Sequence, residues 1–152
     1  VDVISMQITR STNGMIPKKD TARSSDTMGT KHYVDFGVYK VKGSINPYFA
    51  DKTGFSDDDV SIIKEALKTL FVNDSSSARP DGSMEVKQLF WFTHPSKLGL
   101  MSSAKIHDLI DITIKDDSIK STKYEDYDIK LNEEKIAQMK KDGLKVEVIE
   151  GI

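Results

Sequence analysis

Three histidines, His32, His94 and His107, are the only imidazoles in a chain of 152 residues that contains no cysteine. Nucleophilic catalysis needs a base beside its nucleophile, and none of the three stands in a recognisable catalytic pattern. The lack of cysteine excludes disulfides, thiolate zinc sites and cysteine nucleophiles. The sequence therefore predicts no catalytic triad.

Metal and nucleotide chemistry have no better support. His107 and Asp111 have the i, i+4 spacing that places two ligands on one helix face, but no pattern such as His-Glu-x-x-His accompanies them. The consecutive acids Asp57, Asp58 and Asp59 would point about 100° apart on a helix and cannot all face one ion. There is no Walker loop or dinucleotide-type glycine cluster, so neither a metal nor a cofactor is predicted.

One catalytic alternative stays open at His32. Its imidazole could move a proton while Lys31 and Arg23 stabilise phosphate charge, which would make the chain a metal-independent endoribonuclease.

Basic residues are concentrated towards the amino end. Up to Lys42 the chain has seven basic against four acidic residues, whereas the rest has 15 basic against 20 acidic residues. This asymmetry predicts a polyanionic partner at the basic end. Chance variation over a mixed-charge surface is the other interpretation.

Two strands are expected to position the basic residues. Residues 3–9 alternate apolar and polar side chains, which predicts a half-buried strand, and β-forming residues return over 31–45. In the second strand Lys40 and Lys42 share a face with Phe36 and Val38, opposite Tyr39. If the face of Tyr39 packs on the core, the two lysines would point outward beside an aromatic group, as on a nucleic-acid surface or an ordinary solvated face. Between the strands, residues 11–30 have too few apolar side chains to build a core and are expected to form a functional or disordered loop.

The remaining chain predicts a mixture of helices and strands. Ser56 and Asp59 form a capping-box pattern before an apolar stripe that continues to Phe71. Residues 75–82 read as a loop, and residues 85–93 as a central strand covered on one face by a helix. Residues 106–114 fit either a helix or a strand, 133–141 a short helix, and 144–148 a final strand. Trp91 is assigned to the core, with base stacking as its alternative role. The predicted core comprises Phe55, Val60, Ile63, Leu67, Leu70, Leu89 and Trp91.

Length and composition predict one domain over residues 1–152. No apolar run is long enough for a membrane span, and nothing reads as a signal peptide, so a cytoplasmic location is expected. The chain begins in an apolar run without an initiator methionine, and we expect it to be part of a longer subunit.

Several motifs occur in a characteristic order. They are Ile8-Thr9-Arg10, Met28-Gly29-Thr30-Lys31-His32, Gly37-Val38-Tyr39, Ile45-Asn46-Pro47-Tyr48-Phe49-Ala50, Lys52-Thr53-Gly54-Phe55-Ser56, Ser77-Ala78-Arg79, Gly82-Ser83-Met84 and His94-Pro95-Ser96-Lys97-Leu98-Gly99. In these motifs the chain resembles the Cascade backbone subunit of type I-C and I-B CRISPR complexes, a member of the repeat-associated mysterious protein (RAMP) superfamily. The resemblance covers about residues 3–100.

The resemblance implies an α+β fold like the RNA-recognition motif, with a ferredoxin-like antiparallel sheet and a helix packed on one face. The first half of the family fold would be absent. Residues 11–30 would form a mobile, basic, thumb-like loop. The related type III backbone subunits cleave RNA, whereas type I members are not expected to do so.

The implied function is a non-catalytic structural subunit that coats the CRISPR guide RNA in a type I interference complex for antiviral defence. Its partners would be the guide RNA, further copies of the subunit, other Cascade subunits and, through the guide, target DNA, with no membrane. The charge pattern and the resemblance together assign RNA binding to Arg10, Lys18, Lys19, Arg23, Lys31, His32, Lys40, Lys42 and Arg79. A protein-interaction module that uses the acidic tail and binds no RNA is the second alternative.

Overall fold

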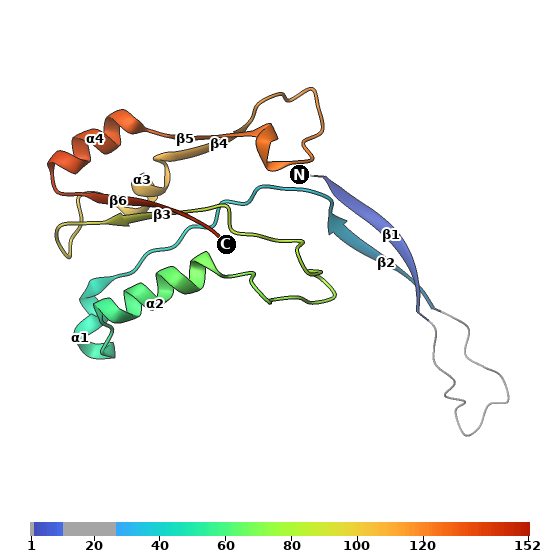
Figure 1. Ribbon diagram of the computed structural model, residues 1–152, viewed down its shortest axis with the longest axis horizontal. Coiled ribbons are helices and arrows are strands. Elements are labelled where there is room, and N and C mark those ends of the chain that lie inside the picture. The colour runs from blue at the N-terminus through green and yellow to red at the C-terminus, as the bar shows by residue number, and fades with distance from the viewer. Residues whose placement is uncertain (1, 11–26) are drawn as a thin grey trace, which may run out of the picture. The chain divides into compact units, whose positions relative to one another are not determined.

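The computed structural model describes residues 2–10 and 27–152, with mixed helices and antiparallel strands (Figure 1). Its strands are β1 (Val3–Arg10), β2 (Thr27–Val34), β3 (Gln88–Thr93), β4 (Ile110–Ile114), β5 (Tyr127–Leu131) and β6 (Lys145–Glu150). Its helices are α1 (Ala50–Thr53), α2 (Asp57–Lys68), α3 (Ser103–His107) and α4 (Glu133–Lys141), with short 3-10 turns η1 (Pro47–Phe49) and η2 (Tyr124–Asp126). The predicted α+β class is confirmed, and the arrangement is consistent with part of a ferredoxin-like fold. Among the described residues the strands form three pairs: β1 with β2, β3 with β6, and β4 with β5.

The chain forms two compact units. The first comprises Val1–Lys40 and Ile112–Asp128, and the second comprises Val41–Asp111 and Ile129–Ile152. The single domain expected for residues 1–152 stays a prediction, and each unit is described separately below.

The first unit contains a two-stranded ribbon of β1 and β2 with different side chains on its two faces. Directly paired residues share a face, so the pairs Ile4 with Tyr33 and Met6 with Lys31 lie on one side. The pair Ser5 with His32 lies on the other side. One face is therefore mainly apolar apart from Lys31, and the other carries polar side chains.

Residues 112–128 of the same unit are tied to the end of the ribbon. The Lys120 ammonium donates to the Asp35 carboxylate at 2.9 Å and lies 3.9 Å from Asp2. The hydrogen bond to Asp35, with its negative charge, raises the pKa of Lys120 above its ordinary value. The rings of Phe36 and Tyr127 lie 6.2 Å apart. These contacts join the chain that follows β2 to the segment between β4 and β5.

The second unit is built on the antiparallel pair β3 and β6. On one face α2 packs against β3, and the Lys64 ammonium lies 5.0 Å from the centre of the Trp91 ring and 2.6 Å from the Glu147 carboxylate. Phe92 and Val146 are paired on the opposite face and pack against the buried core. The strand pair therefore has α2 on one face and the core on the other.

The core is formed by α3, α4 and the residues that directly follow these two helices. Among the described residues its five buried members are Ile106, Leu109, Ile136, Met139 and Leu144. Leu131 and Met101 are partly buried against it. None of the seven residues predicted for the core belongs to this cluster, so that prediction is wrong. Leu70 is 48% exposed, and the other six are only half-buried: Phe55, Val60, Ile63, Leu67, Leu89 and Trp91.

Helix α2 begins with the predicted capping box. The Ser56 hydroxyl accepts from the Asp59 backbone N–H at 3.4 Å, and the Asp59 carboxylate accepts from the Ser56 backbone N–H at 2.8 Å. These two bonds satisfy N–H groups that a helix start otherwise leaves without partners. The hydrogen bonds from Ser56 lower the pKa of Asp59 below its ordinary value of 3.8.

Several predicted boundaries are wrong. Strand β2 covers residues 27–34, so the expected loop ends earlier and the expected strand does not reach 45. Residues 27–30 pair with β1, whereas residues 35–46 have no regular structure although β-forming side chains are common there. Helix α2 ends at Lys68 rather than Phe71, and Asn73 adopts a positive φ of 58° shortly afterwards.

The β3 predictions also need correction. The strand begins at Gln88 rather than Glu85. It was expected to be a central strand, but β6 is its one strand partner in the described part of the chain. Its apolar residues are shielded by α2 and by the core rather than by strands on both edges.

The ambiguous segment 106–114 contains the end of α3 and then β4. The predicted helix 133–141 is confirmed as α4, and the final strand as β6. Across the described ranges 2–10 and 27–152, no helix is both long and apolar enough to cross a membrane.

Candidate nucleic-acid interface

The ribbon of β1 and β2 borders the most basic part of the sequence. Arg10 ends β1, Thr27 begins β2, and these two residues are directly paired. The chain therefore leaves and re-enters the ribbon at one end. The predicted contacts Lys18, Lys19 and Arg23, with most of the predicted thumb-like loop, lie outside the described residues, as does the side chain of Arg10.

Lys31 and His32 are both exposed, but they lie on opposite faces of the ribbon. Lys31 is paired with Met6 on the mainly apolar face. On the other face the His32 Nδ1 and the Ser5 hydroxyl lie 2.9 Å apart, within hydrogen-bonding distance. The described residues therefore do not bring Lys31 beside the His32 imidazole as the ribonuclease arrangement requires.

Lys40 and Lys42 are exposed, yet no strand places them on a shared face. They lie in the irregular segment 35–46, where the alternation used to predict that both lysines point outward, opposite Tyr39, does not apply. The prediction of their orientation is therefore wrong. The assignment of RNA binding to both lysines stays a prediction.

Arg79 lies in the loop after α2 and is half-buried. Its Nη2 donates to the Asp74 carboxylate at 2.9 Å. Sequence reasoning singled out Arg79 but missed Asp74. The signal available was an acid five residues before the arginine, at the other end of a serine-rich loop.

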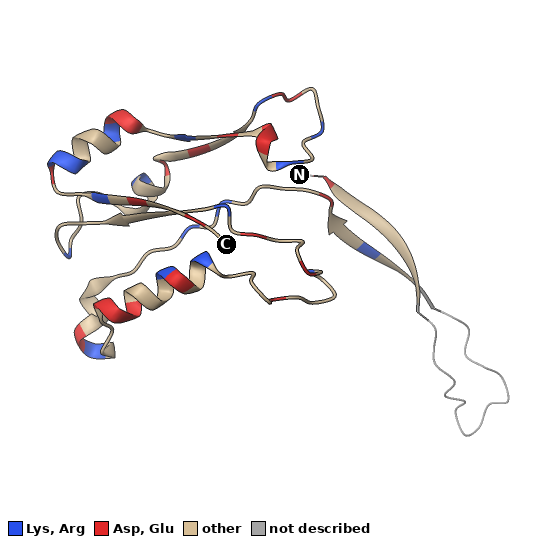
Figure 2. Cartoon of the chain, viewed as in Figure 1, with Lys and Arg blue, Asp and Glu red and all other residues tan. Residues whose placement is uncertain are grey.

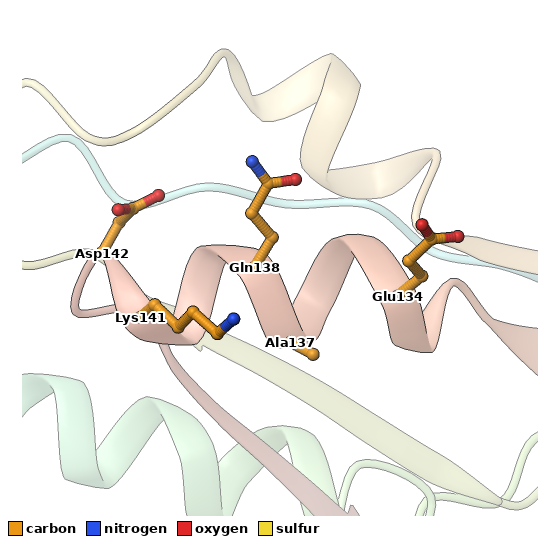
Figure 3. Close-up of a pocket in the computed structure, with 5 residues that line it drawn as sticks. All are labelled: Glu134, Ala137, Gln138, Lys141 and Asp142. Carbon is orange, nitrogen blue, oxygen red and sulfur yellow. The ribbon is translucent and has the colours of Figure 1, made fainter.

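Charges of both signs are spread over the described helices and loops (Figure 2). A shallow hollow along α4 is lined by the exposed residues Glu134, Ala137, Gln138, Lys141 and Asp142 (Figure 3). These side chains include two acids and one lysine, and none is buried. The hollow has neither the apolar lining nor the convergent polar groups typical of a small-molecule site.

His107 and Asp111, whose i, i+4 spacing did not by itself predict a metal site, do not share a helix. Helix α3 ends at His107, and Asp111 lies in β4. The His107 Nε2 lies 3.1 Å from the Gly43 carbonyl oxygen. In the part of the chain that the structure describes, no three His, Asp or Glu residues are grouped to hold a metal ion.

His94 has a structural contact in the loop after β3. Its Nδ1 accepts a hydrogen bond from the Leu100 backbone N–H at 3.1 Å. The neighbouring Gly99 has a φ of +78°, and a Cβ there would lie 3.4 Å from the His94 ring. The loop therefore closes around this imidazole.

The observed class is an α+β protein whose paired β1 and β2 border a basic segment, consistent with a partial RAMP fold. The family model of CRISPR-associated protein Cas7 matches residues 1–132. The chain therefore belongs to the Cas7 family, which confirms the resemblance at the level of the family. No curated protein matches the chain.

Proposed function

We propose that this chain is a non-catalytic RNA-binding subunit that holds the sugar-phosphate backbone of a CRISPR guide RNA in a type I interference complex. The pairing of β1 with β2 carries the proposal, because it brings together both ends of the basic segment. From Arg10 to Lys31 the sequence has five basic residues, Arg10, Lys18, Lys19, Arg23 and Lys31, against the two acids Asp20 and Asp26.

The chemistry of these residues suits a guide RNA. Lysine and arginine bind phosphates through charge and hydrogen bonds without reading the bases. A subunit that serves guides of many sequences must hold them in this way. Membership of the Cas7 family supports this ligand class.

The proposal extends to the assembly. Its partners would be further copies of the chain and other subunits of a type I-C or I-B complex, with target DNA reached through the guide. The site of action would be cytoplasmic.

Charge reversal tests the RNA contacts. We expect Lys18→Glu, Lys19→Glu and Arg23→Glu together to lower retention of labelled guide-repeat RNA about tenfold or more at moderate salt, because phosphate contacts are replaced by repulsion. The measurement is a filter-binding titration. The control reverses Lys105, Lys135 and Lys145, which changes the net charge equally outside the basic segment.

The same titration separates the alternatives. Equal losses in both triple variants would contradict the assignment of binding to the basic segment. Cleavage of the RNA that is abolished by His32→Ala would favour the endoribonuclease. A lack of retention even at low salt would favour the protein-interaction module.

A further inference from the structure

The loop between α2 and β3 holds Arg79 in a defined position. The Ser76 backbone N–H donates to the Arg79 carbonyl at 2.7 Å, and the Arg79 backbone N–H donates to the Ser76 carbonyl at 3.1 Å. The Ser76 hydroxyl also accepts from the Arg79 backbone N–H at 3.1 Å. This closed turn fixes the backbone from which the guanidinium projects.

The guanidinium of Arg79 is only partly satisfied. An arginine offers Nε–H and the adjacent Nη2–H as a planar fork that fits two oxygens of one anion. Here Nη2 donates to an Asp74 oxygen at 2.9 Å. Nε is shielded from solvent and has no hydrogen-bond acceptor among the described residues. Within the part of the chain that the structure describes, one half of the fork is therefore unused.

The pair with Asp74 is open to exchange. About 40% of the Arg79 side chain and 47% of the Asp74 side chain are exposed. Ion pairs with this much exposure contribute little to stability, because water screens them. An incoming anion can therefore compete for the guanidinium without removing a buried charge.

We propose that Arg79 is a phosphodiester-binding residue and that the Asp74 carboxylate occupies its guanidinium until RNA replaces it. This inference rests on the proposed RNA-binding function. A phosphate group presents two anionic oxygens at the spacing that the arginine fork accepts, so it can use Nε–H as well as Nη2–H. Asp74 would thus reduce the affinity of this subsite for RNA in the free protein.

Neutralising Asp74 gives the first test. We expect Asp74→Asn to raise the affinity for a labelled single-stranded RNA about twofold to fivefold, the range set by an exposed ion pair. The control Asp81→Asn removes the same charge from the same loop two residues beyond Arg79. Fluorescence anisotropy at fixed ionic strength measures both. An equal gain in the two variants, or no gain in Asp74→Asn, overturns the inference.

Changing Arg79 gives the second test. Arg79→Gln should lower RNA affinity and reduce the dependence of log affinity on log salt by about one phosphate contact. Arg79→Lys keeps the charge but lacks the fork, and it should recover only part of the loss. The double variant Asp74→Asn, Arg79→Gln should bind like Arg79→Gln alone. A further gain from Asp74→Asn in the absence of Arg79 contradicts the role assigned to the pair.

The results distinguish this inference from the function on which it rests. RNA binding that is lost on reversing Lys18, Lys19 and Arg23 but unaffected by Asp74→Asn and Arg79→Gln overturns the inference alone. Absence of RNA binding in every variant overturns both. Inorganic phosphate that binds the wild type but not Arg79→Gln, while Arg79→Gln leaves RNA affinity unchanged, would identify a site for free phosphate rather than for RNA and would also count against the inference.

Discussion

Lys64, Arg79 and Lys120 each lie within 3 Å of a carboxylate in their own unit, at 2.6, 2.9 and 2.9 Å. Lys64 links α2 to β6 through Glu147, and Lys120 links the segment after β4 to Asp35. Those two lysines have a role within the fold. The count of basic residues in a sequence therefore does not show how many of them already pair with an acid in the fold.

Truncation in the core should destabilise the second unit. Ile136 is 2% exposed and belongs to the buried cluster formed by α3, α4 and the residues Leu109 and Leu144 that follow these helices. We expect Ile136→Ala to lower the free energy of unfolding by about 2–5 kcal/mol, because it removes apolar contacts and leaves a cavity. Urea denaturation followed by Trp91 fluorescence measures the change.

Leu70→Ala is the matched control, because Leu70 was expected in the core but is 48% exposed. Its effect should stay within about 0.5 kcal/mol, as for most surface substitutions. A larger loss for Leu70→Ala than for Ile136→Ala would contradict the position of the core.

At the scale of elements, the start of α2 should make stability depend on pH. The lowered pKa of Asp59 means that its stabilising contribution is complete above its ordinary value of 3.8 and is lost as the pH falls through the lowered pKa. We expect Asp59→Ala to reduce the melting temperature at neutral pH and the difference from wild type to shrink below about pH 3.8. Thermal unfolding monitored by circular dichroism over this pH range measures the effect.

Asp58→Ala provides the comparison for Asp59→Ala. It removes an acid from the same helical turn but leaves the capping box intact. Its effect at neutral pH should be smaller, because only the interaction with the helix dipole is lost. Equal losses in the two variants would argue against the capping role of Asp59.

Helices α2 and α4 could be predicted from sequence because their signals are local. Ser56 and Asp59 start α2, and Gly143 adopts a φ of +96° just beyond the end of α4. The extent of β2 could not be predicted in the same way. Gly29 and Thr30 belong to a strand because they pair with Ile8 and Gln7. The residue types at 29 and 30 do not by themselves indicate this pairing.

The core was harder to predict than the helices. The apolar stripe of α2 is periodic, but the side chains of Val60, Ile63 and Leu67 are only half-buried. Ile106 and Leu109 are fully buried although periodicity left their segment ambiguous. Ile106 and Leu109 are buried because α3 packs against α4, which lies far away in the sequence. Local sequence patterns do not indicate such long-range packing.

At the scale of the whole molecule, the proposed RNA contacts predict binding that depends on salt more than on base sequence. Two unrelated single-stranded RNAs of equal length should bind with similar affinities, and log affinity should fall linearly with log salt. Titrations at several salt concentrations measure both. Strong preference for one base sequence, or binding insensitive to salt, would contradict contacts dominated by phosphate.

The candidate interface could be predicted only in part. The concentration of cations near the amino end was visible in the sequence, and the β1 and β2 pairing is consistent with a basic connection between the strands. The pair of Arg79 with Asp74 depends on a folded loop, and the pair of His32 with Ser5 depends on strand register. The basic residues indicated a polyanionic ligand, whereas the structure was needed to show that the side chains of Arg79 and His32 already have hydrogen-bond partners.

The pairing of β3 with β6 also has a consequence for synthesis on the ribosome. Leu89, Phe90, Trp91 and Phe92 are translated well before their partners Ile149, Val148, Glu147 and Val146. Until β6 has been synthesised, β3 lacks this strand partner, and its apolar and aromatic side chains can bind chaperones or cause aggregation. A stop codon placed just before Lys145 should therefore yield an insoluble product.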